Sequence, residues 1–221
     1  MEKEIRTIIH MNPSISSIRM LDDLFLRDEP SIDNAITMFN KFPGLNWRGM
    51  AHILTFAKSI QALCALKESG CRELFIGIES GSASIRRKIN KPGTVQQVVE
   101  VIHSILQAGI DVKGYFIFGF PDETAIDAEE TYSLALKLKN ISQNTKGTFR
   151  TSVFQFRPYH GTQLYNELLQ RGKTIHTIKS NIALNVIEGR SQFNFQSGNY
   201  SNISDDLLND FILKTQSFSG D

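Results

Sequence analysis

The chain has 221 residues, of which 41% are hydrophobic and 21% are charged, so it can bury a core and is not an intrinsically disordered chain. Its 24 basic and 23 acidic residues leave a formal net charge of +1, which argues against a domain that binds polyanions. The two cysteines, Cys64 and Cys71, are too few for a disulfide framework or a four-cysteine metal site. The N-terminus lacks a signal-peptide pattern and no run of about 18 apolar residues occurs, so we expect a cytoplasmic protein without a membrane span.

Short apolar runs alternate with helical periodicities along the first half of the chain. Residues 17–25 (SIRMLDDLF) form a strand-like run, and Ser31 is predicted to cap the helix that follows. Residues 45–50 (LNWRGM) predict a second strand. A helix over 57–69 comes next, with Cys64 on its apolar face.

The same alternation continues to the C-terminus. Residues 74–78 (LFIGI) predict a third strand, and Thr94 with Gln97 three residues later forms a capping box that begins a strong amphipathic helix. Residues 112–120 (VKGYFIFGF) predict a fourth, two-sided apolar strand. The remaining expected elements are a helix over about 124–139, a strand over 152–156, a helix capped by Thr162 and a short helix near Asp205.

Two-sided apolar strands that alternate with helices predict an α/β fold with a parallel sheet covered by helices. Two arrangements remain open on this pattern, a doubly wound open sheet and a barrel or part-barrel. Neither G-x-G-x-x-G nor G-x-x-x-x-G-K-[ST] follows any predicted strand, which disfavours a dinucleotide-binding or P-loop fold.

Polar residues and glycines gather directly after each predicted strand. Asp22 and Asp23 end the first strand, and Glu79 and Ser80 end the third. The other strands lead to His52, to Gly119 and Pro121, and to Tyr159 and Thr162. A turn or a helix cap explains each group alone. Their repetition after every strand favours a ligand site at the carboxyl ends of the strands.

Four segments in order resemble the radical S-adenosylmethionine (SAM) core, and they point to the branch of methylthiotransferases and cobalamin-dependent members. These segments are 17–25 with 45–50, 70–94 (GCRELFIGIESGSASIRRKINKPGT), 108–124 (AGIDVKGYFIFGFPDET) and 156–168 (FRPYHGTQLYNEL). The resemblance covers roughly residues 1–172. It implies a partial (β/α) barrel of TIM-barrel-like type, made of family strands 2 to 6, over residues 1–180. Residues 181–221 would form a C-terminal extension with one short helix.

The resemblance also implies SAM-binding roles for residues at the strand ends. Asp22 and Asp23 would hold the SAM amino group, and Glu79 and Ser80 would meet its ribose and carboxylate. The adenine-lining segment would contain Phe118, Gly119 and Pro121, and the turn after the last strand would contain Tyr159 and Thr162. These roles are chemically reasonable because an ammonium prefers carboxylate or carbonyl oxygens and a ribose diol prefers a carboxylate acceptor.

The C-x3-C-x2-C motif that holds the 4Fe-4S cluster in this family is missing, and its expected position lies before Met1. We expect Cys64 and Cys71 to be buried apolar residues rather than ligands, and no other metal site is expected. In the family the cluster reduces SAM to a 5′-deoxyadenosyl radical, so we expect this chain alone to be inactive. A cobalamin domain, where relatives have one, would lie upstream.

The chain is therefore predicted to be part of a radical SAM core. It would be a truncated gene product, an expressed fragment, or one chain of a split enzyme whose partner supplies the cluster. The alternatives are a non-catalytic adaptor that uses the barrel as an interaction surface, and an open α/β domain for another nucleotide-like ligand. Without the first family strand, the strand at 17–25 would be an edge, which predicts association into a dimer.

Four basic residues follow the ESGS segment: Arg86, Arg87, Lys88 and Lys91. We interpret them as a solvated helix face, with contact to an anionic substrate as the alternative. No aromatic residues are interleaved with them, so nucleic-acid binding is not expected.

Overall fold

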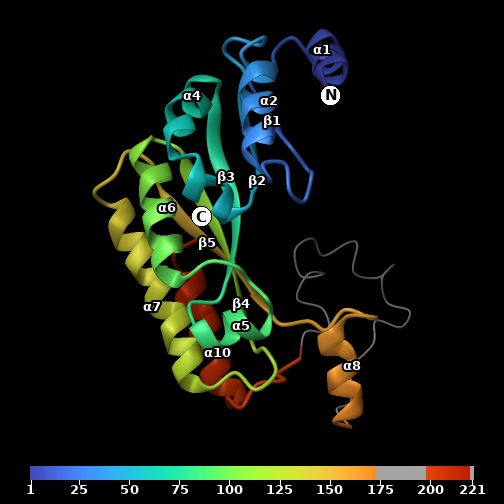
Figure 1. The fold of residues 1–221 in the computed structure, drawn as a ribbon, viewed down its shortest axis with the longest axis vertical. Helices are drawn as coiled ribbons and strands as arrows, with labels where there is room; N and C mark the ends of the chain where they lie inside the picture. Colours follow the sequence, from blue (N-terminus) through green and yellow to red (C-terminus); the bar gives the residue numbers. More distant parts are fainter. Residues whose placement is uncertain (173–197, 220–221) are drawn as a thin grey trace. The chain divides into compact units, whose positions relative to one another are not determined.

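The computed structural model describes residues 1–172 and 198–219, and these residues contain one five-stranded sheet (Figure 1). Its strands are β1 (Ser17–Arg19), β2 (Asn46–Ala51), β3 (Cys71–Glu79), β4 (Asp111–Phe118) and β5 (Phe149–Gln155). They lie in the order β1-β2-β3-β4-β5, and the first pairs are parallel, with Ile18 opposite Trp47 and Met50 opposite Phe75. Parallel strands in sequence order confirm the predicted partial (β/α) barrel class.

Helices connect the strands. Their bounds are Glu2–Met11 (α1), Glu29–Phe39 (α2), Ile53–Lys58 (α3), Leu63–Glu68 (α4), Ala83–Lys88 (α5), Val95–Gln107 (α6), Ala125–Ser142 (α7), Gln163–Gln170 (α8) and Asp205–Gln216 (α10). The predicted capping box of Thr94 and Gln97 begins α6. Within the described ranges, no helix combines the length and the apolar character needed to cross a membrane.

The start of α2 differs from the prediction. Asp28 is the N-cap residue, and its side chain accepts a hydrogen bond from the Ser31 N–H at 2.9 Å. Ser31 is the third residue of the helix, and its hydroxyl oxygen accepts a hydrogen bond from the Asp28 N–H at 3.0 Å. The two residues thus form a capping box, so the prediction that Ser31 is the cap was wrong by one helical turn.

Two other predicted elements are shorter or interrupted. The strand expected over 17–25 ends at Arg19, and the chain returns to the sheet only at Leu26, which forms a single bridge with Ala51. The helix expected over 57–69 is divided into α3, a 3-10 turn (Ile60–Ala62) and α4. The interruption occurs because Ser59 leaves helical geometry, with φ −126° and ψ 36°.

The described residues form two compact units. The first contains Met1–Ile78, Pro92–Gly114 and Lys137–Arg150, and the second contains Glu79–Lys91, Tyr115–Leu136, 151–172 and 198–219. In the core of the first unit, the fully buried ring of Trp47 stacks on Phe39 with centroids 4.6 Å apart.

The core of the second unit includes residues near the C-terminus. Phe118 of β4 stacks on Phe211 of α10, with ring centroids 6.3 Å apart. The Thr151 hydroxyl donates to the Thr215 carbonyl oxygen at 2.8 Å. Residues 198–219 therefore pack as part of the second unit. The predicted boundary at 180/181 lies outside the described residues and stays a prediction.

Candidate functional site

Glu79 ends β3 in an unusual backbone conformation. Its φ of 66° lies in the left-handed region, which costs a non-glycine residue about 1–2 kcal/mol. Its Oε1 lies 3.1 Å from Lys91 Nζ, and the Lys91 and Glu79 side chains are 18% and 23% exposed. Strained conformations of this kind persist only where the surrounding structure determines them, and they are concentrated at functional sites. Glu79 thus places a partly exposed carboxylate at the end of β3.

The Ser80 hydroxyl is fully buried and is bonded within the protein. Because the Thr131 hydroxyl donates to the Asp127 carbonyl oxygen at 3.0 Å, the 2.9 Å contact between Ser80 Oγ and Thr131 Oγ1 must use the Ser80 hydrogen. Ser80 Oγ also accepts a hydrogen bond from the Ser82 N–H at 3.0 Å. The Ser80 side chain therefore has no donor left for a ligand, and it holds the loop after β3.

At the end of β4, a buried carboxyl group binds the backbone. Glu123 is 0% exposed, and its Oε2 accepts a hydrogen bond from the N–H of Gly119, which has a φ of 86°. Burial raises the pKa of Glu123 to about 7, although hydrogen bonds from the Gly119 and Phe120 N–H groups act in the opposite direction. The other oxygen, Oε1, has no hydrogen-bond partner among the described residues. The ring of Phe118 is fully buried in the core.

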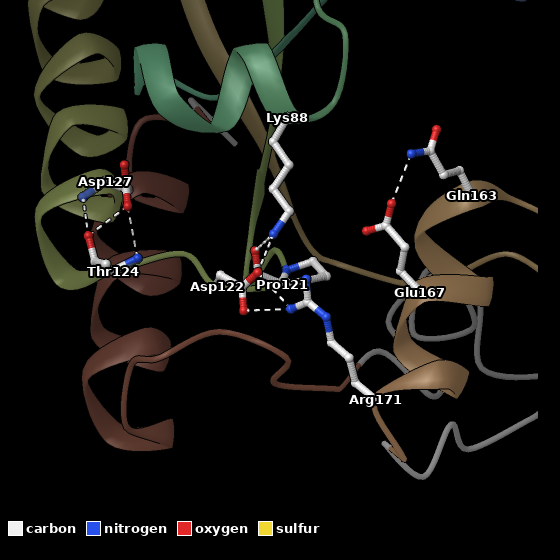
Figure 2. Close-up of polar contacts among 8 residues, drawn as sticks. All are labelled: Lys88, Pro121, Asp122, Thr124, Asp127, Gln163, Glu167 and Arg171. Carbon is white, nitrogen blue, oxygen red and sulfur yellow. Dashed lines mark hydrogen bonds and ion pairs between the residues drawn. The ribbon is translucent and has the colours of Figure 1, made fainter.

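Two cations converge on Asp122, as Figure 2 shows. Lys88 Nζ donates to the Pro121 carbonyl oxygen at 2.7 Å and to Asp122 Oδ2 at 2.5 Å. Arg171 Nη1 donates to both Asp122 oxygens, at 2.9 and 2.8 Å. The hydrogen bonds from Lys88 and Arg171 lower the pKa of Asp122. These contacts connect α5 and the end of α8 to the loop that contains Pro121.

Tyr159 lies in the turn after β5. It is 65% exposed, and the Arg157 guanidinium carbon lies 5.4 Å from the centroid of its ring. The Tyr159 carbonyl oxygen accepts a hydrogen bond from the Thr162 hydroxyl at 2.7 Å, and Thr162 is the N-cap of α8 as predicted. The turn therefore presents an aromatic ring at the surface of the second unit.

Asp22 and Asp23 lie in the first unit, exposed, between β1 and α2. Asp22 is one of the residues that line a cavity of about 270 Å³, together with Leu24, Phe25 and Met38. The other predicted site residues all lie in the second unit, and they are Glu79, Ser80, Phe118, Gly119, Pro121 and Tyr159.

The basic residues after the ESGS segment do not form a solvated helix face, so that interpretation was wrong. Arg86 is 3% exposed, and its Nη1 donates to the Ser80 carbonyl oxygen at 3.2 Å. Lys88 and Lys91 bind Asp122 and Glu79 as described above, and only Arg87 is exposed. Three of the four charges are therefore bound within the protein, Arg86 and Lys91 to residues 79–80 and Lys88 to the loop after β4.

Three polar residues of this region were not identified from the sequence: Glu123, Asp127 and Thr131. Although burial alone would raise it, the pKa of Asp127 is lowered to about 2 by hydrogen bonds from Ser82, Ser84 and Thr124. One signal was present: Thr124 and Asp127 have the spacing of a capping box, and they bond reciprocally at the start of α7 (Figure 2).

The two cysteines differ from each other in burial. Cys71 is buried, and burial raises the pKa of its thiol. Cys64 is exposed, because α4 turns Leu63 and Leu66 inward instead, so the expectation that Cys64 is buried was wrong. A cluster with one open iron needs three thiolates, and these two residues, one of them held as a buried thiol, do not fit it. In the part of the chain that the structure describes, no group of three His, Cys, Asp or Glu residues could hold a metal ion.

Comparisons with known proteins agree on one family. The model of the radical SAM superfamily matches residues 43–135. The uncharacterised methyltransferase PH0819 of Pyrococcus horikoshii is 33% identical over 161 residues, which cover 72% of this chain and 33% of that protein. The bacteriochlorophyllide d C-12(1)-methyltransferase of Chlorobaculum tepidum is 31% identical over 105 residues, covering 47% of this chain and 21% of that enzyme. A tRNA-2-methylthio-N(6)-dimethylallyladenosine synthase of Anaplasma marginale is 30% identical over 99 residues, covering 44% and 21%.

Among solved structures, the cobalamin-dependent SAM radical enzyme OxsB aligns with a TM-score of 0.66 at 14% identity, covering 94% of this chain and 34% of OxsB. The radical SAM methyltransferase TsrM of Kitasatospora setae aligns with a TM-score of 0.57 at 15% identity, covering 76% and 30%. At these identities the likeness shows the fold. The chain spans 21% to 34% of the length of each of these relatives. By its sequence matches, the chain belongs to the radical SAM superfamily.

Proposed function

We propose that this chain is part of the core of a radical SAM methyltransferase and that it binds SAM at the carboxyl ends of its strands. The observation that carries the proposal is Glu79, a partly exposed carboxylate held in a strained backbone conformation at the end of β3. Methyl transfer is favoured because the relative with the longest of the alignments described above, PH0819, carries the name of a methyltransferase.

In this proposal each element contributes one part of the site. Glu79 accepts hydrogen bonds from the ribose hydroxyls. The loop containing Gly119 and Pro121 lines the adenine. The buried Phe118 ring precedes this loop and packs in the core beneath it. The turn that contains Tyr159 covers the part of the proposed SAM site next to β5. The Ser80 side chain supports Glu79, since its hydroxyl is bonded to Thr131.

The 4Fe-4S cluster of the family is assigned to cysteines other than the two in this 221-residue sequence, because Cys64 and Cys71 do not fit it. Any cobalamin would likewise be held by another segment. We therefore expect the 221-residue chain alone to bind SAM weakly and to form no 5′-deoxyadenosine. A non-catalytic adaptor remains the competing function.

Calorimetric titration with SAM tests the site, with and without a polypeptide that carries C-x3-C-x2-C and its reconstituted cluster. Glu79→Ala should weaken SAM binding about 10- to 100-fold, because a hydrogen bond to a charged group contributes about 1.5–3 kcal/mol. Glu129→Ala, at an exposed position of α7, is the matched control and should bind like the unmodified chain. Equal affinities for all three proteins would remove Glu79 from the site.

The chemistry is tested separately by chromatography for 5′-deoxyadenosine after anaerobic reconstitution with iron and sulfide and reduction with dithionite. We expect no product from the chain alone and product once the cluster-bearing polypeptide is added. Product from the chain alone would return Cys64 and Cys71 to consideration as ligands. Absence of both binding and product in the presence of the cluster would favour the adaptor.

A further inference from the structure

The loop after β3 is held by a helix that lies about fifty residues further along the chain. Thr131 of α7 is fully buried, and its Oγ1 accepts a hydrogen bond from the Gly81 N–H at 3.0 Å. The same oxygen accepts a hydrogen bond from the Ser80 hydroxyl, while the Thr131 hydroxyl donates to the Asp127 carbonyl oxygen. One threonine thus binds two consecutive residues of the loop, and the next residue, Ser82, binds back to Ser80.

A second contact lies one helical turn earlier on α7. Asp127 Oδ1 accepts hydrogen bonds from the hydroxyls of Ser82 and Ser84, each at 2.5 Å. Its Oδ2 accepts from the Thr124 N–H and the Thr124 hydroxyl, at 2.9 and 2.6 Å. The carboxylate therefore connects the first turn of α7 to the start of α5. Because these donors are fixed, the loop cannot rotate without breaking charge-assisted hydrogen bonds.

The loop and the helix also approach each other too closely for any side chain between them. A Cβ atom at Gly81 would lie 2.4 Å from the Glu130 carbonyl oxygen and 2.8 Å from Thr131 Cα. The backbone of the loop is therefore in direct contact with α7 at the residue that Thr131 binds. Glu79, with its φ of 66°, immediately precedes this fixed segment.

We propose that Thr131 and Asp127 are positioning residues for the SAM site: their hydrogen bonds to residues 80–84 hold the loop in the one conformation that presents the Glu79 carboxylate to the ligand. The inference rests on the proposed function, since it assigns Glu79 to ligand binding. Neither residue touches the ligand in this proposal. They act through the loop, and the left-handed conformation of Glu79 is what they maintain.

The test compares two buried threonines of the second unit in the full 221-residue chain. Thr131→Val replaces the hydroxyl with a methyl group of similar size, and Thr131→Ser restores it. Thr151→Val is the matched control, because Thr151 is 1% exposed and its hydroxyl also donates to a helix carbonyl, that of Thr215. Amide hydrogen exchange at Gly81 and Ser82 is measured by NMR, and SAM affinity by titration in the presence of the cluster-bearing polypeptide.

We expect Thr131→Val to accelerate exchange of the Gly81 amide and to weaken SAM binding at least about tenfold, the effect of one lost hydrogen bond of about 1.4 kcal/mol. Thr131→Ser and Thr151→Val should stay within about threefold of the unmodified chain. Unchanged Gly81 exchange in Thr131→Val, or unchanged affinity despite faster exchange, would overturn the inference. If Thr131→Val does not fold, Ser80→Ala removes the hydrogen bond to Thr131 and the acceptor of the Ser82 N–H, so faster exchange of the Ser82 amide with weaker SAM binding is expected, and unchanged Ser82 exchange or unchanged affinity would overturn the inference.

The two proposals fail in different ways. If the unmodified chain binds no SAM under these conditions, the proposed function is wrong, and the positioning of a ligand group is wrong with it. The exchange rates would still show in that case whether α7 holds the loop. If the unmodified chain binds SAM and Glu79→Ala weakens binding while Thr131→Val does not, the proposed function stands and only the positioning role is lost.

Discussion

The carboxyl group of Glu123 accepts a hydrogen bond from the backbone N–H of Gly119, four residues earlier in the chain. Both residues are buried, and the bond closes the loop between β4 and α7. The carbonyl oxygen of Glu123 also accepts a hydrogen bond from the Asn202 N–H at 2.8 Å. One residue thus connects the β4 loop to the segment that precedes α10.

Glu123 should make the stability of the protein depend on pH. Its pKa of about 7 in the folded state exceeds the ordinary value of 4.5, so between pH 4.5 and 7 the folded state holds a proton that the unfolded state has released. The free energy of unfolding should therefore fall as pH rises through this window, by about 3 kcal/mol at roughly 1.4 kcal/mol per pH unit. Urea unfolding at pH 5, 6, 7 and 8 measures this decrease in the free energy of unfolding.

The matched variant for this prediction is Glu123→Gln, which keeps an oxygen acceptor for the Gly119 N–H and cannot titrate. The difference in unfolding free energy between Glu123→Gln and the unmodified chain should change across pH 4.5–7 and be constant above about pH 8. Glu129→Gln, at an exposed position, should follow the unmodified chain at every pH. A constant difference across the whole range would show that Glu123 is not the titrating group.

Gly81→Ala should destabilise the protein by about 3 kcal/mol, at the upper end of the cost of overpacking, because the added Cβ would meet the backbone of α7. Gly161→Ala is the comparison: its φ of 82° strains an alanine by about 1 kcal/mol, but nothing lies within 4 Å of the added atom. Thermal unfolding of the two variants should rank them in this order. The reverse order would contradict the close approach of the loop and α7.

The two cysteines should react at very different rates. In the folded chain a thiol reagent such as 5,5′-dithiobis(2-nitrobenzoic acid) should modify the exposed Cys64 promptly and leave the buried Cys71 unmodified. Both should react once the chain is unfolded in guanidinium. Cys64→Ser should abolish the fast reaction and Cys71→Ser should not. Two fast equivalents in the folded chain would place Cys71 at the surface.

The ion pair between Asp122 and Arg171 should contribute little to stability. Its side chains are 49% and 47% exposed, so water and salt screen the attraction. A double-mutant cycle with Asp122→Asn and Arg171→Gln should give a coupling energy close to zero, which falls further at 0.5 M salt. A large coupling energy that resists salt would mean that the pair is shielded in solution.

The elements of the fold could be predicted where the pattern is local. The capping box of Thr94 and Gln97 and the two-sided apolar run that became β4 each depend on neighbouring residues, and both lie where expected. The end of β1 was misplaced, because the hydrophobic run continues to Phe25 while the pairing with β2 stops at Arg19. Pairing depends on the partner strand, which the run itself does not contain.

The same distinction between local pattern and tertiary packing applies to the candidate site. The segments around Glu79 and Gly119 carry the family pattern in order, so the residues alone indicated that each lies at the carboxyl end of a strand of a radical SAM core. The folded structure was needed to show that the Ser80 hydroxyl is bonded to Thr131, that Glu123 is a buried carboxyl and that Cys64 is exposed. The physical reason is that hydrogen bonding and burial depend on which surfaces pack together. Ser80 and Thr131 are 51 residues apart, and the pattern around either one does not indicate the other.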